Sequence, residues 1–281
     1  MSVALHWAAL ACYLAGTGVY LVFVLSQRRA LHRVGATVLG AGFLLHTLAL
    51  GTAWAERGVL PAATLRQSLD LLAWALMGVS LAVNLRVRVM ILGAVTAPVC
   101  SLLMLAAAVL PPAAAPPSPL VRSLWVTVHV VAVMLGYALL ALNFLGGVLY
   151  LVQERQIRGK KLGAAFRRLP PLNRLEALSH QALVAGFVLM TLGLVIGAAY
   201  AQATLGSYWR WDPKEVWALV TWLLYAALIH TRLVQGWRGR RGAWLGAVAF
   251  AVLVFTYLGV GLLVPGYHAF GTIDQIRGPL P

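Results

Sequence analysis

Charged residues are scarce in this chain of 281 residues, and acidic ones are the scarcest. Asp and Glu together number 7 against 22 Lys and Arg, and charged residues make up only 10% of the sequence. A soluble domain carries about 25% charged residues. Here 61% of the residues are hydrophobic and the mean hydropathy is +0.85. The composition excludes a water-soluble globular enzyme and a disordered chain, and it indicates a helical protein that crosses a membrane many times.

Cysteine is also nearly absent. The two cysteines, Cys12 and Cys100, lie within apolar runs, and no CxxC motif occurs. This pattern argues against a disulfide framework, a zinc site and a thiol relay. The N-terminus lacks a basic segment before its first apolar run, and that run is too long for the core of a signal peptide. We therefore expect a retained helix there.

Eight apolar segments are long enough to span a membrane, since a span needs about 20 residues. The third segment is the weakest, because Asp70 lies near its start, and the fifth is long enough to project from the bilayer. The sequence predicts an all-α polytopic membrane protein with residues 1–281 in a single integral membrane domain. The expected spans are 3–25, 34–54, 67–85, 89–110, 121–152, 176–200, 215–234 and 243–264.

The net charge of +15 is distributed very unevenly along the chain. Lys and Arg cluster in every second connection between the expected spans, and residues 153–174 form the most basic of these loops. The positive-inside rule places such loops in the cytoplasm, so both termini and residues 201–217 are predicted on the outer side. Because the basic residues are confined to loops, we expect no nucleic-acid partner.

The segment 201–217 contains the strongest local signal, a cluster of aromatic residues. A belt of interfacial Trp and Tyr explains any one of them, but it does not explain a helix start directly after them. Asp212 suits an N-cap, Pro213 suits the first helical turn, and Glu215 suits the positive end of the helix dipole. The result is a rigid platform for stacking on a planar ligand. Its aromatic members are Tyr208, Trp209, Trp211 and Trp217.

Histidines supply the second signal. His129 follows Trp125 by one helical turn, so both residues share a face near the outer surface. His268 follows the last expected span and lies on the same side. Two imidazoles beside a group of tryptophans fit a bis-histidine haem site.

Three further histidines lie within the expected spans. His230 should lie about 22 Å deeper than Glu215, at 1.5 Å per residue. His180 is expected at a similar depth, and His46 somewhat past the middle of the second span. Each suits either an interhelical hydrogen bond or a ligand role, and the sequence leaves both open. His6 and His32 lie near the ends of spans and are interpreted as interfacial or loop residues.

Cationic side chains are also expected on the outer side. They could pair with the carboxylates of a bound ligand, since charge-assisted pairs of this kind are strong. Ordinary interfacial anchoring is the alternative for each of them. They are Arg57, Arg66, Arg122, Arg210 and Lys214.

The run GSYWRWDPKEVWALVTWLLYAALIHTR, residues 206–232, resembles the CcsA (ResC) family. These are the tryptophan-rich "WWD" haem-handling proteins of System II cytochrome c biogenesis. Residues 122–145 and 175–197 resemble the helices that precede this motif, and residues 60–74 weakly resemble an earlier motif. The chain departs from the family at a few positions: Leu205 and Tyr200 stand where Trp is usual, and Thr64 and Gln67 stand where Asn and Glu are usual.

The resemblance implies roles for individual residues at the outer site. His129 and His268 match the two outer histidines that ligate haem iron. Trp209, Trp211 and Asp212 match the core of the WWD motif, which positions the haem edge and is expected to support the reaction. Further residues expected to line the haem are Trp125, Tyr208, Arg210 and Trp217.

The resemblance also implies an inner haem site. His230 matches the family's transmembrane histidine, and the opposite iron ligand is expected from a CcsB-like membrane partner on a separate chain. The family often has Tyr at the position of His180, so no role for His180 or His46 follows from the resemblance. Both remain candidates from their depth alone.

The function implied is haem transport and presentation, followed by covalent attachment of haem b to CxxCH motifs of apocytochrome c. The reaction would make the protein the catalytic subunit of a holocytochrome c synthase, or haem lyase, in the cytoplasmic membrane, with its active face outside. Thiol-reducing proteins would act indirectly. Alternatives are a non-ligating haem-binding regulator of haem synthesis, a haem exporter and a membrane scaffold. An exporter would be expected to show repeats or broken helices, and no internal repeat is evident.

Overall fold

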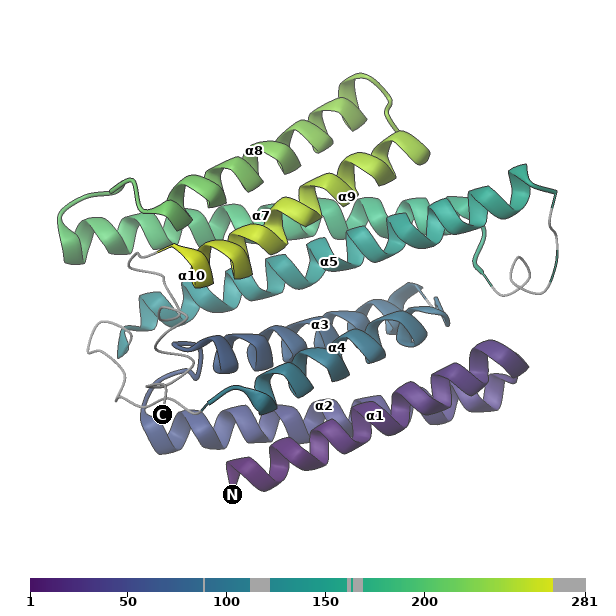
Figure 1. The fold of residues 1–281 in the computed structure, drawn as a ribbon, viewed down its shortest axis with the longest axis horizontal. Coiled ribbons are helices and arrows are strands. Elements are labelled where there is room, and N and C mark those ends of the chain that lie inside the picture. The colour runs from purple at the N-terminus through teal and green to yellow at the C-terminus, as the bar shows by residue number, and fades with distance from the viewer. Residues whose placement is uncertain (88, 112–121, 161–162, 164–168, 265–281) are drawn as a thin grey trace, which may run out of the picture. The chain divides into compact units, whose positions relative to one another are not determined.

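The computed structural model describes residues 1–87, 89–111, 122–160, 163 and 169–264 (Figure 1). Every regular element within these residues is a helix, and eight helical segments are long and apolar enough to cross a membrane, the last of them made of α9, η2 and α10 together. This confirms the all-α fold and the eight predicted spans. The helices are α1 (Ser2–Ser26), α2 (Arg29–Arg57), α3 (Leu65–Val87), α4 (Leu92–Val109), α5 (Leu124–Arg158), α7 (Leu172–Leu205), α8 (Pro213–Val234), α9 (Arg240–Val254), the π-helix η2 (Phe255–Gly259) and α10 (Val260–Leu263).

The chain divides into two compact units. Unit 1 comprises residues 1–112 and 152–174, and unit 2 comprises residues 113–151 and 175–281. Unit 1 therefore holds α1 to α4, whereas unit 2 holds α8 to α10 and most of α5 and α7. The single integral membrane domain expected from the sequence stays a prediction.

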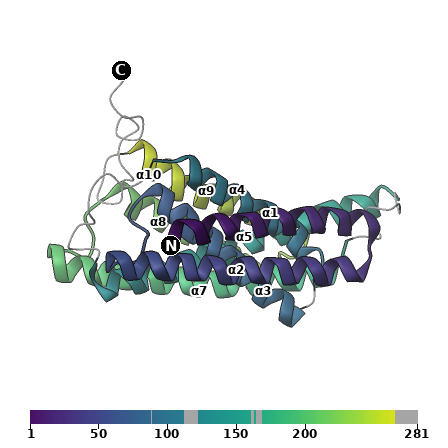
Figure 2. The ribbon, with the colours of Figure 1, turned by 90° about the horizontal axis from the view of Figure 1, so that it is seen from below.

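In unit 1, α1 and α2 run side by side (Figure 2) and pack closely because glycines on α2 accept aromatic rings from α1. A Cβ atom at Gly42 would lie 2.8 Å from the ring of Tyr13, and one at Gly35 would lie 2.8 Å from the ring of Tyr20. These glycines are seven residues apart and so face the same way. Small residues at a helix interface allow the backbones to approach, which is the usual basis of helix association in membranes.

The start of α3 is capped by residues in the weakly matching motif. The Oγ1 atom of Thr64 accepts a hydrogen bond from the backbone N–H of Gln67 at 3.2 Å, and the Gln67 Oε1 atom accepts one from Ala63 at 3.0 Å. This pattern is close to a capping box, for which Ser or Thr followed by Glu or Gln is typical, except that Gln67 accepts from the residue before the N-cap. The departures at Thr64 and Gln67 therefore retain the chemistry of a helix cap.

In unit 2, α5 and α7 pack through glycines on both helices. A Cβ atom at Gly136 would lie 3.0 Å from the backbone N of Met190, and one at Gly193 would lie 2.5 Å from a methyl group of Val133. The glycines of α7 thus serve close packing, and α7 is continuous from Leu172 to Leu205. The haem-exporter alternative predicts broken helices, and α7 is not broken.

The α9–η2–α10 helix packs against α8 through polar contacts around Thr256. Its hydroxyl lies 2.8 Å from that of Thr221 and donates to the carbonyl oxygen of Val252 at 2.8 Å. Phe255, the first residue of the π-helix, packs edge-on against Trp217 with ring centroids 4.7 Å apart. Figures 1 and 2 both place α10 beside the start of α8.

The opposite end of α8 is held by a buried ion pair. The Arg232 guanidinium donates to Glu176 on α7, and the second carboxylate oxygen of Glu176 accepts from the backbone N–H of Gly239 at 3.2 Å. Gly239 is the N-cap of α9. One carboxylate therefore joins α7, the end of α8 and the start of α9.

Several helices extend beyond the predicted spans; α2, for example, runs over Arg29–Arg57 rather than 34–54. The fifth continues to Arg158 rather than 152, and the sixth runs over Leu172–Leu205 rather than 176–200. Polar residues such as Gln153 and Glu154 end a hydrophobic run, but they do not end a helix. The basic loop 153–174 therefore begins with helix, and only residues 206–212 of the segment 201–217 lie outside helices.

Candidate functional site

The connection between α7 and α8 carries the aromatic cluster. Gly206, with φ +75°, directly follows α7, and Ser207 makes two hydrogen bonds to Trp209. The Ser207 hydroxyl donates to the Trp209 carbonyl at 2.7 Å and accepts from its N–H at 3.3 Å. The connection therefore has its own internal hydrogen bonds before α8 begins.

Glu215 fixes the backbone on both sides of Trp211. Its Oε2 atom accepts from the N–H groups of Arg210 at 2.9 Å and Asp212 at 3.3 Å. Between them Trp211 takes φ +59°, a left-handed conformation that is unfavourable for a residue with a side chain. The carboxylate thus holds Trp211 in a strained turn, of the kind that persists only where the surroundings impose it.

Asp212 completes the start of α8. The Oδ1 atom accepts from the backbone N–H of Lys214 at 2.9 Å, Pro213 is the first helical residue, and Glu215 supplies the reciprocal half of a capping box. The predicted N-cap, proline and dipole positions are confirmed. The Asp212 side chain is buried and engaged in capping, which accounts for its presence without a role as a base.

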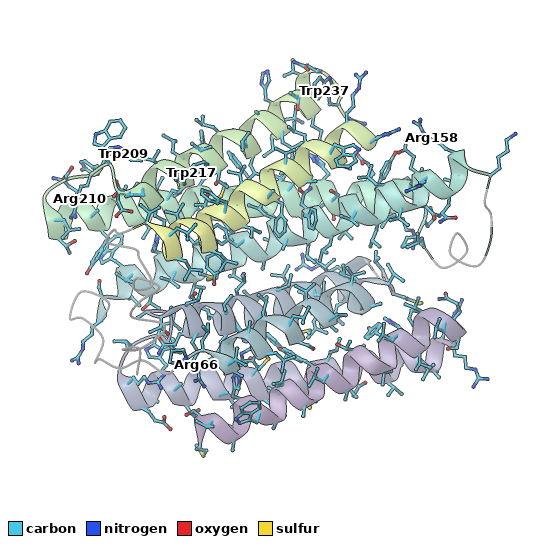
Figure 3. The ribbon with its side chains drawn as sticks, in the orientation of Figure 1. Arg66, Arg158, Trp209, Arg210, Trp217 and Trp237 are labelled. Atoms are coloured by element: carbon cyan, nitrogen blue, oxygen red, sulfur yellow. The ribbon has the colours of Figure 1, made fainter. Side chains whose placement is uncertain are left out.

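The rings in this connection lie largely outside the packed helices. Trp211 is 76% exposed, Tyr208 is 64% exposed and Trp209 is 36% exposed. The rings of Trp209 and Trp211 meet edge-on, with centroids 5.8 Å apart and planes at 85°. Figure 3 shows Trp209 and Arg210 at the start of α8, with Trp237 at its far end. Exposed apolar rings on a pinned backbone are suited to binding a flat apolar ligand.

His129 on α5 packs against α7 below this connection. Its Nδ1 atom lies 2.7 Å from the carbonyl oxygen of Gly193, and a Cβ atom at Gly197 would lie 2.8 Å from the imidazole ring. A carbonyl only accepts, so Nδ1 carries a proton, and in the neutral imidazole the lone pair then lies on Nε2, as in most metal-ligating histidines. Gly197 precedes the end of α7 by eight residues, which is about 12 Å along a helix.

Other predicted residues of the outer site are only partly described. Trp125 lies one turn before His129 on α5 and is 61% exposed. Trp217 lies in the second turn of α8 and contacts Phe255. His268 falls outside the described residues.

His230 and His180 lie at the other end of unit 2. His230 is exposed near the C-terminal end of α8, close to Arg232. His180 lies on α7, and its Nδ1 atom is buried and makes no hydrogen bond to any described residue. No direct contact between these two histidines is evident among the described residues.

Two histidines of unit 1 have partners that the sequence did not indicate. His6, expected to be interfacial, is mostly buried and lies 3.2 Å from Asp70. His32, expected near a helix end, does lie in the first turn of α2, but its Nδ1 atom is 3.2 Å from the Tyr20 hydroxyl. The spacing of residues along one helix could not reveal these contacts, because Asp70 and Tyr20 lie on different helices from the histidines they contact.

The fold and the site together define a class of protein. It is a helical membrane protein with eight candidate spans that displays a pinned aromatic loop at the end of one unit and, on a neighbouring helix, a histidine whose Nδ1 atom is held by a backbone carbonyl.

The known proteins that this chain resembles identify the family. Residues 62–268 match the family model described as "Cytochrome C assembly protein". The chain is 34% identical over 259 residues to the cytochrome c biogenesis protein CcsA of Guillardia theta, with 85% of each protein covered. It is 33% identical over 288 residues to CcsA of Synechococcus elongatus, covering 86% of this chain and 89% of the relative. The chain belongs to the CcsA family of cytochrome c biogenesis proteins.

A solved structure shares the fold. The chain resembles cytochrome c haem lyase CcmF with a TM-score of 0.67 and 22% sequence identity. The match covers 92% of this chain but only 46% of the CcmF chain, so the chain spans about half the length of that protein.

Proposed function

We propose that this protein presents haem b to apocytochrome c and takes part in attaching haem covalently to the CxxCH motif. The reaction would occur on the outer side of the cytoplasmic membrane, on which both termini lie. Membership of a cytochrome c biogenesis family supports the process, and the fold shared with the cytochrome c haem lyase CcmF supports the type of reaction.

The observation that carries the proposal is the backbone conformation of Trp211. A belt tryptophan needs only to be apolar and near the membrane surface, and nothing then requires a left-handed turn. Here a carboxylate on α8 holds the N–H groups on both sides of Trp211 and directs its ring outward. Such a strained, pinned turn is often found at functional sites. The rings of Trp211 and Trp209, which are nearly perpendicular, both offer a face to the edge of a haem.

The iron ligands of the outer site are His129 and His268. The hydrogen bond to the Gly193 carbonyl places a proton on Nδ1, so the neutral imidazole has its lone pair on Nε2, which fits ligation of haem iron. We assign the second ligand to His268, five residues after the end of α10 at Leu263. Arg210 and Lys214 supply cations for the haem propionates.

The inner site uses His230 and a partner chain. His230 is exposed on the surface of α8, where a ligand from another protein can reach the same iron. A CcsB-like membrane protein is the proposed source of that ligand. His230 would receive haem from the cytoplasmic side before it reaches the tryptophans.

The chemistry itself belongs to haem and the apocytochrome. Each cysteine sulfur of CxxCH forms a bond to one vinyl carbon, and its proton goes to the adjacent carbon, so no oxidant or reductant is consumed. Both thiols must be reduced beforehand, which is where thiol-reducing proteins act. This chain holds the vinyl edge and the incoming peptide in position, and such positioning accounts for large rate enhancements.

The test is an absorption spectrum of the protein purified from cells that also produce the partner and an apocytochrome. We expect sharp α and β bands after reduction, typical of low-spin haem with two histidine ligands. His129→Ala and His268→Ala should each weaken the bands and abolish cytochrome c maturation, and His230→Ala should lower the haem content. His32→Ala in unit 1 is the matched histidine control and should leave both unchanged.

A tryptophan pair tests the loop separately. Trp211→Ala should abolish maturation, whereas Trp244→Ala should not, although Trp244 on α9 is also more than half exposed. A colourless wild-type protein, or full maturation in His129→Ala, would overturn the proposal and favour a regulator of haem synthesis. The topology is tested with reporters, which should behave as cytoplasmic in residues 153–174 and as external in residues 206–212.

A further inference from the structure

Three side chains that can bind a metal meet inside unit 1, on three different helices. They are His6 on α1, His46 on α2 and Asp70 on α3. His46 is completely buried, and the side chains of His6 and Asp70 are only 15% and 16% exposed. The proposed haem site in unit 2 uses none of them.

The separations of these groups match those of ligands around one ion. The Oδ1 atom of Asp70 lies 3.2 Å from Nδ1 of His6 and 3.2 Å from Nε2 of His46. Bonds of about 2.1 Å at angles between octahedral and tetrahedral place neighbouring ligand atoms about 3.0–3.4 Å apart. Each residue can offer one such atom, and all three atoms lie within 4.8 Å of one another.

Hydrogen bonding does not account for the cluster. Nε2 of His46 and Oδ1 of Asp70 are both buried and lie 3.2 Å apart, but neither atom makes a hydrogen bond of good geometry to any described residue. Buried polar atoms normally have a partner, so this pair needs an explanation. A cation held between the two atoms would satisfy both.

Tyr13 holds His46 in the form that a metal requires. The Tyr13 hydroxyl lies 3.4 Å from Nδ1 of His46, on the ring edge away from Asp70. Donation from Nδ1–H to this hydroxyl leaves the lone pair on Nε2, the atom next to Asp70. The tyrosine ring is itself fixed, because Gly42 lies close against it and no side chain separates them.

We propose that His6, His46 and Asp70 bind a divalent transition-metal ion, with Tyr13 as a positioning residue. Two imidazoles and one carboxylate suit ions such as Zn²⁺, Fe²⁺ or Co²⁺, whereas Mg²⁺ and Ca²⁺ prefer oxygen ligands. Three protein ligands leave at least one coordination position for water or a small molecule. His6 and His46 precede residue 62, where the match to the family model begins, and the proposal does not depend on haem binding.

The test is metal binding by the full chain, purified in detergent with an affinity tag that contains no histidine. After treatment with a chelator, the protein is titrated with Co²⁺, which reports its ligands through visible d–d bands, and the Zn²⁺ content is measured separately. Neither metal is confused with haem iron. We expect one Co²⁺ per chain, and at least tenfold weaker binding in His46→Ala and in Asp70→Asn. Tyr13→Phe should weaken binding about tenfold and shift the d–d bands, since outer-shell partners contribute about 10- to 100-fold to affinity.

The control is His32→Ala. His32 also lies on α2 and also faces a tyrosine of α1, Tyr20, at 3.2 Å, but it does not belong to the cluster of three. This variant should bind Co²⁺ like the wild type. If His46→Ala does not fold, His6→Ala replaces it in the Co²⁺ titration, because His6 is less buried. The proposal is wrong if the wild type binds no Co²⁺, if binding survives in Asp70→Asn and His6→Ala, or if His32→Ala loses it equally.

Discussion

The strained turn at Trp211 makes a quantitative prediction about stability. A left-handed conformation costs about 1–2 kcal/mol in a residue with a Cβ atom and almost nothing in glycine. Trp211→Gly and Trp211→Ala both remove the indole ring, so the difference between them isolates the backbone at φ +59°. We expect the glycine variant to be the more stable of the two by about 1 kcal/mol.

Trp209 is the control, since its φ is not positive. There glycine only adds freedom to the unfolded chain, so Trp209→Gly should be less stable than Trp209→Ala by about 0.4–1 kcal/mol. The assay is thermal unfolding of the detergent-purified variants by circular dichroism. For a chain of this size 1 kcal/mol corresponds to about 2 °C in Tm. The reasoning fails if glycine is no better than alanine at position 211, or if the two positions show the same sign.

Two further predictions concern the ends of unit 2. Gly197→Ala should reduce haem content without removing an iron ligand, because the added methyl group would lie 2.8 Å from the His129 ring and displace it; the absorption spectrum checks this. Arg232→Ala should lower the free energy of unfolding by about 3–5 kcal/mol, because it leaves the Glu176 carboxylate without its buried partner; thermal unfolding of the purified variant checks this.

Each of these has a matched control. Gly40→Ala adds a methyl group where nothing lies within 4 Å, and it should leave the haem spectrum unchanged. Arg158→Ala breaks an i,i+4 pair with Glu154 at 2.9 Å in which the arginine is 65% exposed, and a pair on a helix surface with a solvated partner contributes less than about 1 kcal/mol. An unaltered spectrum in Gly197→Ala, or equal losses of stability in the two arginine variants, would contradict the interpretation.

The number of spans could be predicted from the sequence because membrane insertion depends on the length and hydropathy of one segment at a time. The helix ends could not. α5 continues to Arg158 through polar residues that favour helix, so the hydrophobic run ends before the helix does. The side of the membrane on which each terminus lies stays a prediction.

The start of α8 was predictable for a similar reason, since Asp212, Pro213 and Glu215 act on their immediate neighbours. The strain at Trp211 was not predictable, because the conformational preferences of tryptophan do not indicate a left-handed turn. The partners of His6 and His46 were hidden as well. Their meeting depends on how three helices cross, and the only local sign was an acidic residue, Asp70, within an apolar run.

The π-helix η2 has a consequence for the segment that follows it. A π-turn contains one residue more than an α-turn, so it acts as a single-residue insertion within a helix. One residue corresponds to a rotation of about 100°. Phe255–Gly259 therefore turns Val260–Leu263, and the direction in which the chain leaves Leu263, by roughly that angle. Deleting one residue here would convert the turn to α-helix and rotate Val260–Leu263 back by that angle. Residue count, as well as residue identity, thus sets the direction in which the last described helix ends.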